Sequence, residues 1–224
     1  MILYAIPTPL GGGPSDALPA SAIGQIQRIK DFAVENAKSA RAFLSAIGLP
    51  VRELNIQVIG EHSDLLSILR QHRDLGLLSE AGCPAIADPG ALLIEAAHRE
   101  GFKVVPLIGP SSIVLALMAS GLEGQRFAFC GYLPREAPER ARRIRALESR
   151  SKRESETEIF IETPYRNDAL LGALLEACKP QTKLCIAADL TLPGESIRTS
   201  HIAAWRRVNA VIGRRPAVFL LLAD

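Results

Sequence analysis

The sequence predicts an α/β protein with two domains, each built from strands and helices around its own sheet. Three observations lead to this class: a length of 224 residues, a 48% share of hydrophobic residues, and short apolar runs that alternate with helical patterns. A domain usually spans about 100–200 residues, so this length allows one large domain or two small ones. Strands that alternate with helices indicate βαβ units and a mainly parallel sheet.

The first half of the chain shows this alternation most simply. Its apolar runs are nearly continuous, as in a sheet that helices cover on both faces. Between them apolar residues recur at helical spacing, for example at Leu65, Leu66, Ile68 and Leu69. The predicted strands are residues 3–6, 31–35, 54–59, 75–79 and 103–107, and the predicted helices are residues 36–47, 63–72, 91–100 and 111–119.

A polar turn bracketed by Gly121 and Gly124 interrupts the pattern, which then restarts. We therefore expect an N-terminal domain of residues 1–121 with a mainly parallel sheet, and a C-terminal domain of residues 122–224 with a mixed sheet. In the second domain the predicted strands are residues 127–132, 158–162, 183–188, 196–199 and 216–222, and the predicted helices are residues 137–150, 168–178 and 202–208.

Charge is distributed unevenly along the chain. Residues 1–121 hold 9 basic and 11 acidic side chains, whereas residues 122–224 hold 17 and 13. A mildly basic second half permits an anionic partner without requiring one. Residues 135–156 hold 8 basic and 5 acidic side chains. They fit either a solvated helix with ion pairs or a surface that contacts RNA phosphates, and they contain no aromatic residue on which a base could stack.

The sequence predicts no membrane span, secretion signal or metal site. The longest apolar runs, at residues 114–119 and 217–223, are far shorter than the roughly 20 residues that cross a bilayer. Residues 1–6 lack a basic start and read as a first strand. The four cysteines form no CxxC pair, and the four histidines lack metal-ligand spacing. We expect a cytoplasmic protein with reduced thiols.

Three unusual loops follow predicted strands, where ligands bind in open α/β sheets. Residues 7–16 are rich in glycine and proline but lack the GxGxxG pattern. Residues 79–90 are long for a connection, and a long loop at a strand end is often functional; within it, Asp88 is expected to cap the next helix, with Pro89 at its first position. In residues 108–112, Gly109 allows close approach of a ligand, and a helix start at Ser111 or Ser112 favours a carboxylate.

Ordered motifs extend through these loops and into the second half. They are LYAIPTPLG at residues 3–11, SEAGCPAIADPG at 79–90, VPLIGPS at 105–111, SGL at 120–122, GYLP at 131–134, FIETPYR at 160–166, and ADLT at 188–191 followed by Glu195. The series resembles the tetrapyrrole methylase superfamily. The nearest branch is the one that methylates a cytidine ribose 2′-hydroxyl in small-subunit ribosomal RNA.

This resemblance implies two α/β domains, a homodimer, and S-adenosylmethionine bound in a cleft between the domains. The implied cofactor-binding residues of the first domain are Pro7, Leu10, Gly11, Ser79, Ala81, Gly82, Asp88, Pro110, Ser111 and Ser112. Those of the second domain are Leu133, Glu162, Thr191 and Ala217, the last three near the adenine.

The expected substrate region departs from that branch. Where the branch carries EDTRHT, this chain has ENAKSA at residues 35–40, which keeps only the acid and a displaced base. The branch also continues past the last strand, so we expect a shorter, separate subfamily. The cofactor loops match better than the substrate region, which favours methyl transfer and leaves the acceptor open.

A ribose hydroxyl is a poor nucleophile and benefits from a general base. By their position at strand ends, Glu35, Glu80 and Glu162 are the candidate catalytic residues. Lys38 and Arg166 are candidates for holding a phosphate or carboxylate of the substrate. Each of these five side chains also fits a solvated charge or a structural ion pair.

Three hypotheses follow for the function. The first is a methyltransferase with an RNA substrate. The second is methylation of a tetrapyrrole-like small molecule, although a large acidic macrocycle would favour a basic trough and residues 1–121 are net negative. The third is a module that binds S-adenosylmethionine without catalysis, which the altered residues 35–40 suggest.

Overall fold

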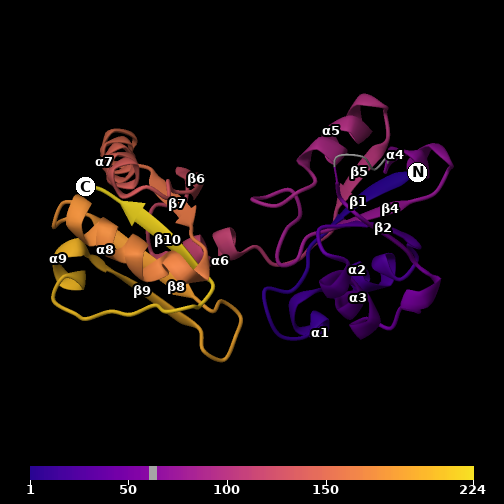
Figure 1. Cartoon of the computed structure of the whole chain (residues 1–224), viewed down its shortest axis with the longest axis horizontal. Helices are drawn as coiled ribbons and strands as arrows, with labels where there is room; N and C mark the ends of the chain where they lie inside the picture. The colour runs from indigo at the N-terminus through magenta and orange to yellow at the C-terminus, as the bar shows by residue number, and fades with distance from the viewer. Residues whose placement is uncertain (61–64) are drawn as a thin grey trace. The chain divides into compact units, whose positions relative to one another are not determined.

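The computed structural model describes residues 1–60 and 65–224, and the chain divides into two compact units, Met1–Ser111 and Ser112–Asp224. Each unit has its own five-stranded sheet with helices packed against it (Figure 1). The α/β class predicted from the sequence is confirmed, with a parallel sheet in the first unit and a mixed sheet in the second.

The N-terminal sheet has the strand order β3-β2-β4-β1-β5, and all its neighbouring strands are parallel. Because the strands are parallel, all their carboxyl ends lie at one edge of the sheet. β4 is the middle strand, and β1 lies between β4 and the edge strand β5. The strands are β1 (Ile2–Ile6), β2 (Asp31–Val34), β3 (Asn55–Val58), β4 (Leu75–Leu78) and β5 (Lys103–Pro106).

Helices cover both faces of this sheet, as its continuous apolar strands predict. One core joins Phe32 and Val34 to residues of α2 and α3, and a second core joins Ala33 and Leu77 to residues of α4 and α5. The alternation along β2 separates the two cores. The helices are α1 (Pro14–Ala17), α2 (Ala20–Ile26), α3 (Ala37–Ala46), η1 (Val51–Glu53), α4 (Leu66–Arg70) and α5 (Ala91–Arg99).

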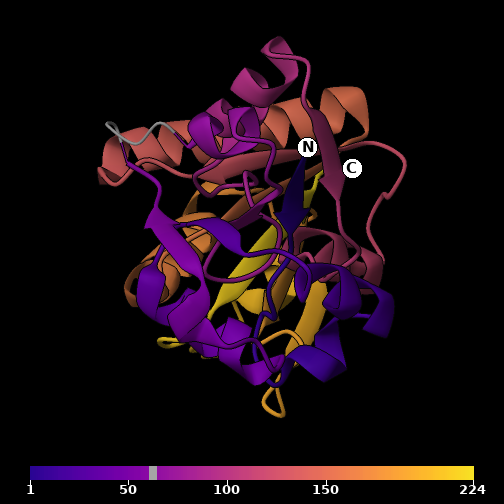
Figure 2. The same cartoon turned by 90° about the vertical axis from the view of Figure 1, so that its right-hand side faces the viewer.

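The C-terminal sheet has the order β6-β7-β10-β8-β9, with β6 parallel to β7 and the other neighbours antiparallel. The last strand, β10, is therefore central; it is yellow in Figure 2. Phe160 and Phe219 stack with ring centroids 5.9 Å apart in the core under α7 and α8. The elements are α6 (Ser112–Ser120), β6 (Phe127–Tyr132), α7 (Ala137–Glu154), β7 (Thr157–Ile161), η2 (Pro164–Arg166), α8 (Asn167–Ala177), β8 (Lys183–Ala188), β9 (Ser196–His201), α9 (Ile202–Trp205) and β10 (Ala217–Leu222).

The division between the units lies before α6, whereas the sequence places it after that helix, at residues 121 and 122. α6 packs against β8, β9 and β10 of the second sheet. The Thr199 hydroxyl also donates to the Ser120 carbonyl over 2.7 Å. An alternating pattern of strands and helices does not tell which sheet a helix packs on, and this is why the two boundaries differ.

Several helices differ from the sequence prediction in extent. Residues 14–26 contain α1 and α2, where no helix was expected. α4 is described from Leu66, and residues 63 and 64 of the predicted helix lie outside the described residues. α7 continues to Glu154, four residues beyond the prediction, and α9 stops at Trp205.

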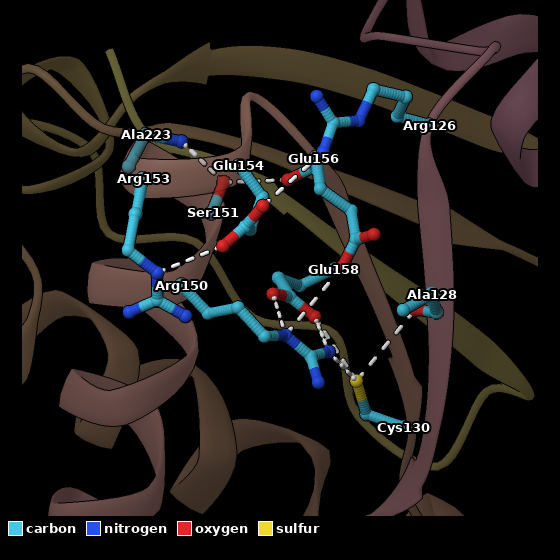
Figure 3. A network of polar contacts seen from close by, with 10 residues as sticks. All are labelled: Arg126, Ala128, Cys130, Arg150, Ser151, Arg153, Glu154, Glu156, Glu158 and Ala223. Carbon is cyan, nitrogen blue, oxygen red and sulfur yellow. Dashed lines mark hydrogen bonds and ion pairs between the residues drawn. The ribbon is translucent and has the colours of Figure 1, made fainter.

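An ion pair between the partly exposed Arg150 and the buried Glu158 connects α7 to β7 (Figure 3). Glu158 is 0% exposed, and its two carboxylate oxygens accept hydrogen bonds from Arg150, from Nε over 2.6 Å and from Nη2 at close range. The Cys130 thiol lies 3.2 Å from Glu158 Oε2 and 3.2 Å from Arg150 Nη2. Burial and the hydrogen bond to Glu158 raise the pKa of this thiol to about 11. The network is therefore a structural anchor with a protonated thiol at neutral pH.

The buried thiol of Cys178 predicts a loss of stability in alkali. Burial, with Glu148 acting in the same direction, raises the pKa of Cys178 to about 12 from an ordinary value of 9.0. The folded protein therefore holds this proton more tightly, so the stabilisation is complete below pH 9 and is lost as pH rises toward 12. We expect the free energy of unfolding to fall by about 1 kcal/mol from this group between pH 7 and pH 10. Urea titrations across that range measure it, and Cys178→Ala should have the smaller pH slope; equal slopes would contradict the assignment.

Candidate functional site

The three loops singled out in the sequence follow β1, β4 and β5, which are neighbours in the N-terminal sheet. Since these parallel strands end at one edge, the loops meet there. The first two are joined by a pair of backbone hydrogen bonds, from Thr8 N–H to the Gly82 carbonyl over 2.9 Å and from Gly82 N–H to the Thr8 carbonyl over 3.0 Å. The buried Thr8 hydroxyl also donates to the Ser79 carbonyl over 3.3 Å.

The third loop packs against the other two. The Cys83 thiol donates to the Pro110 carbonyl over 3.3 Å. A Cβ on Gly109 would lie only 2.4 Å from the Pro7 Cβ, so glycine is required by close packing at that point. The candidate residues Pro7, Gly82 and Pro110 are thereby brought into one layer of interlocked backbone, with Leu10 beside Gly82.

The backbone of the second loop is strained. Gly82 has a φ of 79°, and the non-glycine residues Ala85 and Ala87 have φ values of 65° and 64°. Such conformations are costly for residues with a Cβ and concentrate at functional sites. The structure also corrects one expectation here: α5 begins at Ala91 with Gly90 as its N-cap, so Asp88 and Pro89 do not start the helix.

The Asp88 carboxyl lies instead in an acidic cluster with Glu35 and Glu80. The Glu80 N–H donates to Glu35 Oε2 over 3.0 Å, and the Ser39 hydroxyl donates to Glu80 Oε1 over 3.4 Å. Burial raises the pKa of Asp88, the charge of Glu35 raises it further, and a hydrogen bond from Ser79 opposes them. Two of the three candidate bases are thus close together at the edge where the loops meet.

Residues 35–40 differ from the ribosomal RNA branch that the sequence resembles, and they form the N-terminal cap of α3. Asn36 is the N-cap of α3 and accepts hydrogen bonds from the N–H groups of Lys38 and Ser39 over 2.8 and 3.4 Å. Such a cap satisfies N–H groups that have no partner within the helix. The Lys38 side chain is exposed, which leaves it accessible to a substrate.

The candidate residues of the second unit share one edge of the C-terminal sheet. Leu133 follows β6, Glu162 follows β7, Thr191 follows β8, and Ala217 begins the antiparallel strand β10. Thr191 has a φ of 69°, and its N–H donates to Glu195 over 2.8 Å. The sheet topology therefore gathers residues that are far apart in the sequence.

Glu162 is buried and paired with Arg166. Its Oε1 oxygen accepts hydrogen bonds from Thr163 N–H over 2.7 Å and from Arg166 Nε over 2.9 Å. Its Oε2 oxygen is buried without a hydrogen-bond partner among the described residues. The structure thus brings together two residues that the sequence assigns to different roles, one as a base or cofactor contact and the other as a substrate contact.

S-adenosylmethionine carries positive charge on its sulfonium and ammonium groups. Carboxylates are the side chains that would complement this charge. The Glu35, Glu80 and Asp88 carboxylates lie together, and a cation beside them would relieve the repulsion that raises the pKa of Asp88. The unmatched Oε2 of Glu162 is an acceptor in the second unit. The carboxylates of the first unit fit the positive charge of the cofactor.

A family model for tetrapyrrole (corrin/porphyrin) methylases matches residues 36–204. The chain belongs to this family. It is therefore a methyltransferase, as the sequence motifs indicate, and membership of the tetrapyrrole methylase family implies S-adenosylmethionine as the methyl donor.

Curated relatives share the name "Ribosomal RNA small subunit methyltransferase I". The protein from Mesorhizobium japonicum is 34% identical over 207 residues, which cover 90% of this chain and 68% of the relative. The protein from Vibrio cholerae is 31% identical over 90% of this chain and 69% of its own length. The chain thus spans about two thirds of the length of these tetrapyrrole methylase relatives.

Solved structures confirm the two-unit fold of the family. The methyltransferase CobJ aligns with a TM-score of 0.64 at 17% identity, covering 100% of this chain and 94% of that one. A uroporphyrin-III-C-methyltransferase from Thermus thermophilus aligns with a TM-score of 0.59 at 20% identity, covering 99% and 94%. At these identities the likeness concerns the fold.

Within residues 1–60 and 65–224, no group of three or more His, Cys, Asp or Glu side chains is placed to hold a metal ion. Over the same ranges, no helix has the length and apolar character needed to cross a membrane. Thr8 and Cys83, which join the loops, are absent from the sequence-based site. Thr8 could have been identified from the sequence, because it is a polar residue between two prolines directly after a predicted strand.

Proposed function

We propose that this chain transfers a methyl group from S-adenosylmethionine to a ribose 2′-hydroxyl of small-subunit ribosomal RNA. The observation that carries the proposal is the 34% identity, over 90% of this chain, to a relative named for methylation of that RNA. The interlocked loops at residues 7–11, 79–90 and 108–112 support it, because they offer a rigid cradle at the ligand-binding edge of a parallel sheet.

In this proposal the N-terminal loops hold the methionine part of the cofactor, and Leu133, Glu162, Thr191 and Ala217 contact the adenine side. When bound, S-adenosylmethionine supplies a methyl group on a sulfonium for in-line transfer to an oxygen nucleophile. The protein's contribution is to orient the acceptor and exclude water. Glu80 is the base we favour, since its carboxylate is exposed at the edge where the loops meet and Ser39 orients it.

Glu162 is assigned a positioning role instead, because its Oε1 oxygen already holds Arg166. Lys38, which is exposed, is the residue we propose for holding an acceptor phosphate. Arg166, the other candidate for that role, is instead paired with Glu162. We also propose that the protein is a cytoplasmic homodimer, as the family resemblance implies; light scattering that gives the 24.1 kDa mass of one chain would contradict the dimer.

Transfer of labelled methyl from S-adenosylmethionine to undermethylated small ribosomal subunits tests the proposal. We expect label in RNA, at a ribose that becomes resistant to alkaline cleavage, and calorimetric binding of S-adenosylhomocysteine after chelator treatment. Label in an added tetrapyrrole but not in RNA would favour the small-molecule alternative. Binding without transfer to either acceptor would favour a module that has lost catalysis.

The exposed face of α7 is a candidate surface for RNA phosphates. Arg142, Arg143 and Arg145 are exposed, and none has a hydrogen bond or ion pair to another residue in the described part of the chain. If each contacts one phosphate, the triple alanine variant should reduce the slope of log K against log salt by about 2–3, since one phosphate contributes about 0.7–0.9.

Fluorescence anisotropy with RNA between 50 and 300 mM salt measures this slope. The matched control is Arg126→Ala/Arg153→Ala, which removes two arginines that pair with Glu154. An unchanged slope in the α7 triple variant would show that this helix face is merely solvated.

A further inference from the structure

An exposed tyrosine and an arginine stack on each other at the edge of the C-terminal sheet. The Arg214 guanidinium carbon lies 4.8 Å from the ring centroid of Tyr165. Tyr165 is nevertheless 76% exposed, and Arg214 is also exposed. Since the guanidinium covers one face of the ring, most of the remaining ring surface is open to solvent.

The other arginine–aromatic pair in this unit shows what a purely structural contact is like. Arg198 lies 4.5 Å from the centroid of the Trp205 ring, but Trp205 is only 4% exposed. Its indole N–H donates to the Leu184 carbonyl over 2.9 Å inside the core. Arg198 thus covers a core residue, whereas Arg214 stacks on a ring that contributes little to any core.

The backbone that carries Arg214 is held by buried and charged side chains. Asn167, which is buried, donates from Nδ2 to the Gly213 and Arg215 carbonyls over 3.1 and 2.7 Å. The Ile212 N–H donates to Asp168 over 2.7 Å, and Arg215 Nε donates to Asp189 over 2.6 Å. An exposed side chain on so firmly anchored a loop is preorganised for contact with a ligand.

The backbone that carries Tyr165 is also held in place. It is the central residue of η2, and its neighbour Arg166 points inward to the buried Glu162. The ring therefore projects outward from a turn whose two ends are fixed. Fixing a rigid aromatic side chain in this way lowers the entropy lost when a flat ligand stacks on it.

The position of the pair connects it with the reaction. Tyr165 follows β7 and Arg214 precedes β10, so both lie at the sheet edge that carries Glu162 and Ala217. Arg214 has no carboxylate partner within the described residues, so its positive charge remains available. An aromatic face beside a free guanidinium suits a nucleobase and its phosphate.

We propose that Tyr165 and Arg214 form a stacking platform for one base of the single-stranded RNA that carries the methyl acceptor. The inference rests on the proposed function, which it extends by naming how the acceptor strand is held. The open ring surface of Tyr165 takes the base, and the Arg214 guanidinium contacts the adjoining phosphate. Recognition of this kind tolerates any base but requires an unpaired strand.

The test measures binding of a fluorescein-labelled 12-nucleotide oligo(rC) and of a 12-base-pair RNA duplex by anisotropy. We expect Tyr165→Ala to weaken single-strand binding about tenfold, within the range that stacking of one base contributes. Tyr165→Phe should bind within about twofold of wild type, because the phenyl face is retained.

Arg214→Ala should weaken single-strand binding more than Arg198→Ala, its matched control on β9. Phe127→Ala, a partly exposed aromatic at the opposite end of β6, should leave binding unchanged.

Thermal melts and calorimetry with S-adenosylhomocysteine accompany every variant, and the Tyr165 and Arg214 variants should match wild type in both. Equal single-strand binding by Tyr165→Ala and wild type would overturn the platform while leaving the proposed function intact. Equal weakening of duplex binding would overturn it too, because paired bases are not free to stack. A wild-type protein that binds neither RNA and methylates none would overturn the proposed function and this inference together.

Discussion

Arg150→Met is expected to lower the free energy of unfolding by about 3–5 kcal/mol, because it leaves the Glu158 carboxylate buried without its cation. Methionine keeps much of the length and apolar stem of arginine, so the lost charge is the main change. The Cys130 thiol would be the remaining contact near the carboxylate, and a neutral thiol is a weak hydrogen-bond donor. Urea unfolding at pH 7 measures the difference.

Two further variants separate charge from packing. Arg150→Met/Glu158→Met removes both charges and should recover most of the loss, since a buried ion pair adds little over an apolar pair of similar size. Arg153→Met removes an arginine from the exposed pair with Glu154 on the same helix and should behave like wild type. A stability of Arg150→Met within about 1 kcal/mol of wild type would contradict the buried anchor.

The ion pair also shows where sequence reasoning stops. Apolar periodicity predicts the strands around Phe160 and Phe219, and it predicts a charged helix over residues 137–150. It does not predict that Arg150 turns inward while Arg142 and Arg143 remain in solvent, because all three lie in the same basic segment. Only the packing of α7 on β7 makes that distinction.

The same limit applies to the placement of helices. Residues 111–119 are apolar throughout, so the sequence predicts the helix, but its partner sheet depends on contacts such as that of Thr199 with Ser120. The short helices within residues 14–26 were missed because Gly11, Gly12 and Gly13 and the following prolines suggest an irregular loop. Pro14 is instead the first residue of α1, where proline is well tolerated, and Pro19 is the N-cap of α2.

The candidate site follows the sequence more closely, for a topological reason. Loops after neighbouring parallel strands must meet, so residues 7–11, 79–90 and 108–112 were predictable as a group. The proximity of Glu35 to Glu80 follows in the same way, since β2 and β4 are neighbours. Pairings set by local side-chain geometry were not predictable: Arg166 with Glu162, and Asp88 with the acidic cluster in place of a helix cap.

Gly109→Ala is expected to destabilise the N-terminal unit by about 1–3 kcal/mol, because even one methyl group forces a well-packed contact apart. The added Cβ would lie 2.4 Å from the Pro7 Cβ and 2.8 Å from Leu18 Cδ2. Both neighbours are buried, and Pro7 cannot rotate away, so the loops after β1 and β5 must separate. Since these loops form the proposed cradle, the affinity for S-adenosylhomocysteine should fall about tenfold or more, which corresponds to about 1.4 kcal/mol.

Thermal melts and calorimetry on the same preparation separate the two effects, and Gly24→Ala is the matched control. Gly24 lies in α2 of the same unit with no atom within 4 Å of an added Cβ, so alanine there should be neutral or slightly stabilising. If Gly109→Ala lowers the melting temperature but binds S-adenosylhomocysteine like wild type, the loops are packed as described but do not hold the cofactor. If it changes neither quantity, the contact between Gly109 and Pro7 is itself wrong. A loss of both, with Gly24→Ala unaffected, places the cofactor on the carboxyl edge of the N-terminal sheet.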